Sequence, residues 1–414
     1  MTNDATQLDS SVGPLALDAT QAAPSGGGEM RFAPPASAQR TTVLPRVDAT
    51  GPRVSLSVEP RSRYEPSKLL GAGGMGEVVL VNDHDIGRKV ALKRLLPELT
   101  DLGVLARFVE EIRTVGRLEH PNIVPIHDVG VDEAGRYFFV MKYVQGETLE
   151  SVIEKLAAGD PAYAAKYSTE ARLEIFLNLL HALEYAHAQG VVHRDIKPAN
   201  VMVGHFGEVV LMDWGIAKRV EDERDPAATA DGTLGAHDAG PRGRMFATRV
   251  GSLIGTPAYM SPEQSRGGKI DARSDIYSAT VLFHELLGLE HYLAGKETVE
   301  AMLSAIQSEE IGFLKLVAMH RRPPAELLHV MAKGLKKDPA QRFQSAGELI
   351  SELQAILEGK VRVQCHMTLT KRVYRELGRL ADRAPWVGFA TLIAVAACVV
   401  FAGVEVVRLA LRLG

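Results

Sequence analysis

The chain has very little cysteine, with Cys365 and Cys398 alone among 414 residues. Two thiols exclude a disulfide framework and any zinc site built from cysteines, and they fit a reducing compartment. The chain also lacks a large excess of either sign of charge. The formal net charge is −4, so no global field favours nucleic acid as a partner. Residues 1–40 contain no apolar run behind a basic start, so we expect no signal peptide.

Residues 1–60 are poor in apolar side chains and rich in Ala, Ser, Thr, Pro and Gly. The few apolar residues show no helical or strand period, so this segment cannot bury enough surface to offset its ordering entropy. We therefore predict a disordered leader. A phosphorylated tail or a docking arm is an alternative, but an inert linker is the favoured interpretation.

The most informative stretch is His-Arg-Asp-Ile-Lys-Pro-Ala-Asn, residues 193–200. Asp195 can take a proton from a hydroxyl group, and Lys197, two residues on, can hold a phosphate on the same side. Asn200 can bind a metal ion through its carbonyl oxygen. Thirteen residues later, Asp213 offers a second oxygen ligand of the kind that Mg²⁺ prefers.

This run, followed by Asp213-Trp214-Gly215, resembles the catalytic loop and metal site of protein kinases. Residues 64–358 as a whole resemble a bacterial serine/threonine protein kinase of the eukaryotic-like family. The resemblance implies an α+β, two-lobed protein kinase fold. A small β-rich N-lobe would span residues 64–144, and a large helical C-lobe would span residues 145–358.

The same resemblance implies the chemistry. Asp195 would be the catalytic base, Lys197 would assist it, and Asn200 and Asp213 would hold Mg²⁺ or Mn²⁺. ATP would supply the phosphoryl group, and serine or threonine hydroxyls of proteins would accept it. Lys197 argues against tyrosine specificity, because tyrosine kinases usually lack a lysine at this place.

A glycine-rich hairpin precedes this loop in the chain. Gly71, Gly73 and Gly76 lie between two apolar flanks that are typical of strands, and Val78 begins the second flank. Glycines allow a backbone to approach phosphates closely, although such a hairpin by itself could simply be flexible. The next strand contains Lys93 where the family keeps its Val-Ala-Ile-Lys lysine, which decides for a phosphate-binding role.

The rest of the nucleotide site follows from the resemblance. Residues 105–118 have helical periodicity, and Glu111 lies where the family keeps the glutamate that pairs with Lys93, with Glu110 as its rival. Further along, Met141 would be the gatekeeper behind the adenine pocket. The remaining pocket residues belong to the preceding strand and to the hinge; they are Ala91 and Val144.

The resemblance also assigns structural roles in the C-lobe. Glu263 would pair with Arg342, and Asp275 would hold the backbone of the catalytic loop. Thr256 would hydrogen-bond Asp195 and Lys197. The activation segment, residues 213–263, is long and polar in its middle, and Arg194 could receive a phosphorylated residue from it. The candidate phosphorylation sites are Thr248 and Ser252.

Residues 386–404 form an uninterrupted apolar run, and about 19 helical residues just span a hydrocarbon layer of about 30 Å. We predict a transmembrane helix here, after a basic juxtamembrane segment at residues 359–385 and before a short tail at residues 405–414. Five basic residues precede the run closely, against two that follow it, so the kinase side should be cytoplasmic at a single-pass cell membrane span. A core helix is the alternative.

Small residues recur every fourth position in this apolar run, at Ala390, Ala394, Cys398 and Ala402. Such a face permits close helix contact, which would allow a homodimer. Two rival interpretations of the whole chain remain: a membrane-tethered pseudokinase scaffold, and a soluble kinase whose C-terminal helix is a dimer contact. Loss of Lys93, Asp195 or Asp213 would favour the pseudokinase, and all three are present.

Overall fold

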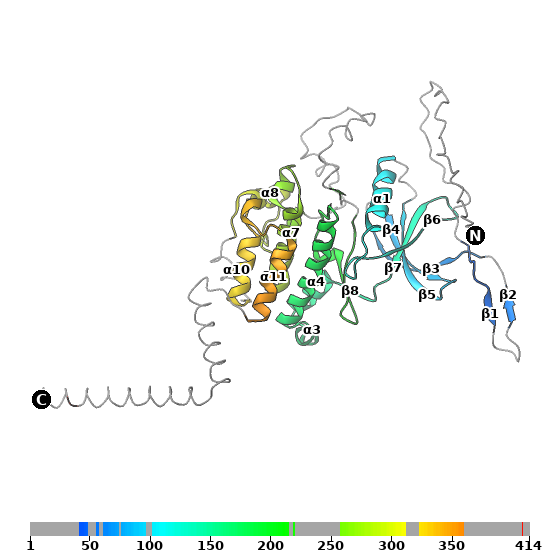
Figure 1. Cartoon of the computed structure of the whole chain (residues 1–414), viewed down its shortest axis with the longest axis horizontal. Helices are drawn as coiled ribbons and strands as arrows, with labels where there is room; N and C mark the ends of the chain where they lie inside the picture. The colour runs from blue at the N-terminus through cyan, green and yellow to red at the C-terminus, as the bar shows by residue number, and fades with distance from the viewer. Residues whose placement is uncertain are drawn as a thin grey trace, which may run out of the picture.

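The structure is a computed structural model, and it separates a β-rich region from a helical region (Figure 1). It describes residues 41–48, 55–57, 61–73, 76–96, 102–214, 218–219, 257–311, 323–359 and 408. The α+β class predicted from the sequence is confirmed.

The β-rich region is a five-stranded antiparallel sheet with the strand order β3-β4-β5-β7-β6. Its strands are β3 (Tyr64–Ala72), β4 (Gly76–Asp83), β5 (Arg88–Leu95), β6 (Ile126–Val131) and β7 (Tyr137–Lys142). Helix α1 (Leu102–Val115) covers the sheet because its buried Phe108 packs on Phe139 of β7, with ring centroids 5.4 Å apart. The predicted glycine-rich hairpin is therefore β3 and β4.

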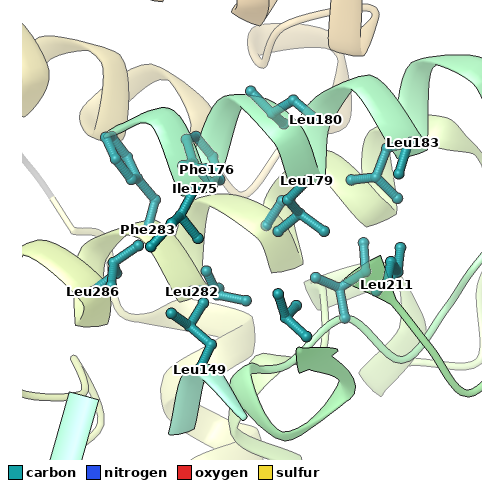
Figure 2. Packing of buried hydrophobic residues seen from close by; sticks show 14 of the residues in the cluster. Leu149, Ile175, Phe176, Leu179, Leu180, Leu183, Leu211, Leu282, Phe283 and Leu286 are labelled. Atoms are coloured by element: carbon teal, nitrogen blue, oxygen red, sulfur yellow. The ribbon is translucent and has the colours of Figure 1, made fainter. Parts of the chain in front are cut away.

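The helical region is built around two long helices that pack side by side. Phe176 of α4 stacks on Phe283 of α7 with centroids 4.1 Å apart, and leucines from both helices fill the surrounding core (Figure 2). The helices here are α2 (Leu149–Ala157), α3 (Pro161–Lys166), α4 (Thr169–Ala188), α6 (Pro262–Ser265), α7 (Ala272–Gly288), α8 (Val299–Ser308), α10 (Ala325–Gly334) and α11 (Ala346–Leu357).

Short strands and 3₁₀ turns carry the catalytic loop on this helical base. They are β8 (Gly146–Thr148), β9 (Val191–Val192), η2 (Pro198–Asn200), β10 (Val201–Gly204), β11 (Val209–Leu211), β12 (Lys218–Arg219), η4 (Pro257–Tyr259) and η5 (Pro339–Gln341).

Local sequence signals set the limits of the long helices. The side chain of Ser168 caps α4 by accepting a hydrogen bond from the Ala171 amide, and Asp271 caps α7 in the same way. Helix α4 stops just before Gly190, whose φ of +73° suits glycine. Gly190 thus ends the helix and turns the chain directly towards the catalytic loop.

The leader prediction differs from the structure near its end. Strands β1 (Arg46–Asp48) and β2 (Ser55–Ser57) pair antiparallel within residues 1–60, which we expected to lack order. The pairing begins from the backbone of residues 41–44, which is held by contacts to residues far along the chain. A non-local contact of this kind leaves no periodic signal in the sequence. Residues 1–40 lie outside the described residues.

The predicted membrane segment cannot be compared with the structure. None of the helices in the described parts of the chain is long and apolar enough to cross a membrane. Residues 386–404 lie outside those parts, and of residues 359–414 the structure describes Gly359 and Arg408 alone.

A buried ion pair links the start of α6 to the turn before α11, as the sequence predicts. Arg342 donates to both carboxylate oxygens of Glu263 at 2.8 Å, and its side chain is fully buried. The same guanidinium donates to the backbone carbonyls of Arg273, Lys336 and Lys337. Because every contact is satisfied inside the protein, this pair fixes the floor of the helical region.

We expect Arg342→Met to lower the free energy of unfolding by about 3–5 kcal/mol, because it leaves Glu263 buried without its partner. Lys296→Met is the matched control, because the Lys296–Glu309 pair is exposed and should change stability by no more than about 0.5 kcal/mol. Denaturant unfolding followed by circular dichroism measures both. Equal effects of the two substitutions would contradict the structural role of Arg342.

Candidate active site

The centre of the candidate site is Lys93, which β5 holds between its neighbours β4 and β7. Its Nζ atom lies 2.6 Å from Glu111 Oε1 and 3.2 Å from Asp213 Oδ1. Glu111 is buried on the inner face of α1, whereas Glu110 is exposed. The structure thus brings together three residues from the sheet, the helix and the end of β11, and it places Glu111 rather than Glu110 against Lys93.

The three charges perturb one another. Burial alone would lower the pKa of Lys93, but the carboxylates of Asp213 and Glu111 raise that pKa above its ordinary value. Burial raises the pKa of Glu111, and Lys93 opposes this effect. For Asp213, burial would raise the pKa, but Lys93 brings it below its ordinary value. The result is a fixed ammonium at neutral pH beside an ionised and 47% exposed Asp213.

The glycine hairpin lies next to Lys93 in the sheet. Val78 of β4 is the register partner of both Gly71 and Lys93. A Cβ at Gly76 would approach the carbonyl oxygen of Arg94 to 2.3 Å, so this position requires glycine. At Gly71, in contrast, a Cβ would meet nothing within 4 Å. Packing therefore does not require glycine at position 71. The space beside this residue is open, and phosphate oxygens could occupy it.

The same sheet also carries the residues expected around adenine, close to Lys93. Ala91 of β5 is the register partner of Met141 in β7, and Val144 follows β7 as a buried residue. Met141 is partly buried and packs against the helical core. Gly73 completes the hairpin turn, where its amide donates to the carbonyl of Gly76 at 2.8 Å. Apart from Glu111, which lies on α1, the predicted nucleotide-binding residues therefore lie on the connected strands β3, β4, β5 and β7, in the turn that joins β3 to β4, or directly after β7.

The catalytic loop gathers three predicted residues around one carboxylate. Lys197 Nζ donates to Asp195 Oδ2 at 2.7 Å. The side-chain amide of Asn200 donates to the same oxygen at 3.0 Å and to the backbone carbonyl of Asp195 at 2.8 Å. Because the side-chain nitrogen of Asn200 donates to Asp195, the side-chain oxygen Oδ1 of Asn200 is the atom left to bind a cation. The carboxylate of Asp195 is thereby oriented, and its side chain stays 27% exposed.

Asn200 and Asp213 lie at the same end of a small antiparallel ladder. Val201 pairs with Leu211, and the backbone amide of Met212 donates to the backbone carbonyl of Asn200 at 2.9 Å. One amide oxygen and one carboxylate are donors that suit Mg²⁺. Among the described residues no cluster of three His, Cys, Asp or Glu could hold a metal. A cation here would therefore complete its coordination with phosphate oxygens and water, which is the usual pattern for Mg²⁺.

The backbone of the site is held in an uncommon conformation at two places. Arg194 has a φ of +72° and Asp213 a φ of +60°, and neither is glycine. Left-handed conformations of such residues cost energy and persist where the surroundings impose them. Both positions concern predicted site carboxylates. Arg194 directly precedes Asp195, and Asp213 carries a site carboxylate itself.

Asp275 holds the backbone of the catalytic loop, as the sequence predicts, and so fixes the conformation at Arg194. Its two carboxylate oxygens accept hydrogen bonds from the backbone amides of His193 and Arg194 at 2.8 and 2.9 Å. His187 Nε2 lies 2.8 Å from the same carboxylate, a contact that sequence reasoning missed. His187 occupies the last turn of α4 and gives no signal beyond its place before Gly190. Burial alone would raise the pKa of Asp275, but His187, His193 and the Arg194 amide keep it below its ordinary value.

Trp214 occupies a closed slot behind Asp213. It is 1% exposed, and its ring meets His193 edge to face with centroids 4.5 Å apart. His193 accepts from the Asp195 amide through Nδ1, which leaves Nε2–H to donate to the Met212 carbonyl. The ring therefore fills this slot completely. Its Nε1–H has no hydrogen-bond partner among the residues that the structure describes.

Several predicted residues of the activation segment cannot be placed. Thr248, Ser252 and Thr256 lie outside the described residues, as does the predicted contact of Thr256 with Asp195 and Lys197. The described part resumes at Pro257. Just beyond it, Gln264 donates to the carbonyl of Arg194 at 2.8 Å, which ties α6 to the catalytic loop.

We expect Asp275→Asn to lower stability by about 3–5 kcal/mol at neutral pH, because an amide cannot accept from both backbone donors. A carboxyl group whose pKa is lower in the folded state stabilises above its unfolded pKa of about 3.9, and this contribution is lost as pH falls through the folded pKa. The gap in unfolding free energy between wild type and variant should therefore narrow as pH drops below about 4.

Urea unfolding at a series of pH values measures this gap. Asp160→Asn is the control, because Asp160 is an N-cap residue of α3 and Asn caps a helix about as well as Asp. Its gap should be small at every pH. A gap for Asp275→Asn that stayed constant down to acid pH would show that the buried carboxylate is not held in its ionised form.

Comparison with known proteins agrees with the geometry. Residues 64–353 match the family model described as "Protein kinase domain". The Streptomyces coelicolor protein named "Probable serine/threonine-protein kinase SCO3848" is 36% identical over 309 residues, covering 73% of this chain and 41% of that protein. Chlamydia caviae serine/threonine-protein kinase PknD is 34% identical, over 72% of this chain and 31% of its own length.

Mycobacterium tuberculosis serine/threonine-protein kinase PknB is 33% identical, over 72% of this chain and 43% of its own length. The chain thus spans less than half the length of each of these curated relatives. The family model, however, covers well over half of the chain. The chain belongs to the protein kinase domain family, as the motifs in its sequence predict.

Proposed function

We propose that the protein is a serine/threonine protein kinase that transfers the γ-phosphoryl group of ATP to serine or threonine hydroxyls of proteins. One observation carries this proposal. Lys93 contacts both Glu111 and Asp213. Through the β10–β11 ladder, this group of charges is connected to the cluster that Asp195 forms with Lys197 and Asn200. Both halves of a phosphoryl-transfer site are therefore assembled in one conformation.

The roles follow from the contacts. Lys93, held by Glu111, would bind the phosphates of ATP, and the hairpin amides near Gly71 and Gly73 would cover them. Asp195 would orient the acceptor hydroxyl and take its proton, while Lys197 would neutralise charge on the transferred phosphoryl group. Asn200 and Asp213 fit Mg²⁺, which when bound would draw charge from the phosphate oxygens. Positioning and charge compensation therefore account for the catalysis.

Two findings support serine and threonine as acceptors. Lys197 is present and contacts Asp195, at a place where tyrosine kinases usually lack a lysine. The relatives named above are all called serine/threonine-protein kinases. We extend that acceptor class to this chain as part of the proposal, together with autophosphorylation of the activation segment at Thr248 or Ser252.

We also propose that residues 386–404 anchor the kinase in the cell membrane by a single span, with the kinase domain on the cytoplasmic side. The uninterrupted apolar run and the basic residues that precede it support this placement. The small-residue face of the run supports self-association of the anchor as a homodimer.

The pseudokinase alternative has little support. A scaffold would not need an ionised Asp213 next to a charged Lys93, or a carboxylate at Asp195 oriented by two donors. Groups that are held together at an energetic cost and remain partly exposed are more typical of catalysis than of structural packing.

We expect Asp195→Asn to lower kcat by about 10²- to 10⁴-fold, because the variant loses its proton acceptor. ATP affinity should change little, since Asp195 contacts the acceptor side. Radiolabelled phosphoryl transfer to a generic basic protein measures the rate, and nucleotide binding by calorimetry measures affinity. Asp160→Asn on the surface of α3 is the matched control with unchanged rate. Full activity of Asp195→Asn would exclude the proposed mechanism.

The membrane proposal has its own test. The full chain should appear in the membrane fraction and resist carbonate extraction, whereas a chain that lacks residues 386–414 should be released. Both forms should keep phosphoryl transfer, because the site lies within residues 64–358. Release of the full chain would favour the soluble kinase whose C-terminal helix forms a dimer contact.

A further inference from the structure

A short β-ribbon stands apart from the five-stranded sheet at the end of the molecule remote from the large helices (Figure 1). It consists of β1 and β2, which form a two-stranded sheet of their own among the described residues. Its base is joined to the domain where the Thr42 amide donates to the Arg61 carbonyl at 2.8 Å, beside a bridge between Thr41 and Ser62. The ribbon is therefore an ordered arm and not part of the kinase sheet.

Asp85, in the turn between β4 and β5, fixes the base of this arm. Its Oδ1 atom accepts hydrogen bonds from the backbone amides of Val43 and Leu44 at 2.9 and 3.0 Å. The carboxylate is 6% exposed and also lies 3.5 Å from Arg63. Because the contacts use backbone donors, they hold the chain in place while its side chains remain directed to solvent.

The arm exposes apolar side chains instead of burying them. Val47 and Leu56 are cross-strand partners, so they lie on one face of the ribbon, and they are 62% and 66% exposed. Val43 and Leu44 at its base, and Ile86 beside Asp85, are also exposed. A two-stranded ribbon is marginally stable by itself, and an apolar surface left open on it marks a site of interaction. We call these five residues the apolar arm surface.

The charge of the segment indicates the chemistry of the partner. Residues 40–63 contain five arginines against two acidic residues, in a chain whose net charge is negative. The arginines are Arg40, Arg46, Arg53, Arg61 and Arg63; the acidic residues are Asp48 and Glu59. Of these arginines, Arg46 and Arg61 are exposed in the structure. Apolar side chains among arginines are complementary to a surface that is anionic outside and apolar beneath.

We propose that the apolar arm surface docks on an anionic lipid bilayer. Val47 and Leu56 would enter the boundary between headgroups and acyl chains, and the exposed Arg46 and Arg61 would remain among the headgroups, whereas Arg63 is already paired with Asp83. Arginines near an anionic leaflet are attracted to its surface, and salt screens this attraction. This contact involves none of the residues of the phosphoryl-transfer site, and it would fix the orientation of the kinase domain at a membrane that residues 386–404 only bring nearby.

Hydrogen exchange of the full chain with vesicles tests the proposal. Vesicles are made of phosphatidylcholine alone or of phosphatidylcholine mixed with phosphatidylserine. We expect the amides of residues 43, 44, 46, 47 and 55–57 to exchange severalfold more slowly with the anionic vesicles, and high salt should remove the difference. The double variant Val47→Asp/Leu56→Asp should lose this protection. Val129→Asp, at another exposed apolar position on β6, should keep it.

The outcomes are separable from those for catalysis and anchoring. Hydrogen exchange is measured at the arm, so an inactive kinase gives the same comparison between the two lipid mixtures. If residues 386–404 do not insert into a membrane, the chain can still be mixed with preformed vesicles, and the exchange of the arm is measured in the same way. Equal exchange in both lipids would overturn the proposal. Protection that grows with protein concentration and does not depend on phosphatidylserine would also overturn it, because a second copy of the chain would then cover the arm.

Discussion

The ammonium group of Lys93, shared between Glu111 and Asp213, is the interaction on which the rest of the site depends. It joins three separate parts of the chain: β5, helix α1 and the segment after β11. Taking these charges partly out of water is costly, and their mutual attraction offsets that cost only while the geometry is maintained. The position of α1 against the sheet, through Phe108 and Phe139, is therefore also a condition for a usable nucleotide site.

Buried carboxylates position the catalytic loop from the helical region. Asp275 on α7 binds two consecutive backbone amides, and Glu263 at the start of α6 is locked by Arg342. Neither group is expected to touch substrate. Asp275 thereby holds the loop in a conformation that includes a left-handed Arg194, and Gln264, the neighbour of Glu263, donates to the Arg194 carbonyl. Rigid support of this kind, together with the hydrogen bonds that Lys197 and Asn200 donate to Asp195, allows a short loop to aim Asp195 and Asn200.

Much of this arrangement could be predicted from the chain alone, and the reasons for success and failure are physical. Glycine spacing, strand alternation and the His-Arg-Asp run are local signals, so the hairpin at Gly71–Gly76 and the loop at Asp195 were recognisable. The contact of His187 with Asp275 was missed because a helical histidine before a glycine carries no pattern. The β1–β2 pair was missed because Asp85, which fixes its base, lies about forty residues away.

The sequence by itself determined which side chains are available for phosphoryl transfer, and in what order they occur, because motif chemistry resides in residue type and spacing. It also determined the apolar run at residues 386–404. Only the tertiary structure decided that Glu111 rather than Glu110 reaches Lys93, and that an arm of the leader is ordered with its apolar face exposed. Contacts between distant segments depend on how helices and sheets pack, and that packing is a property of the whole domain.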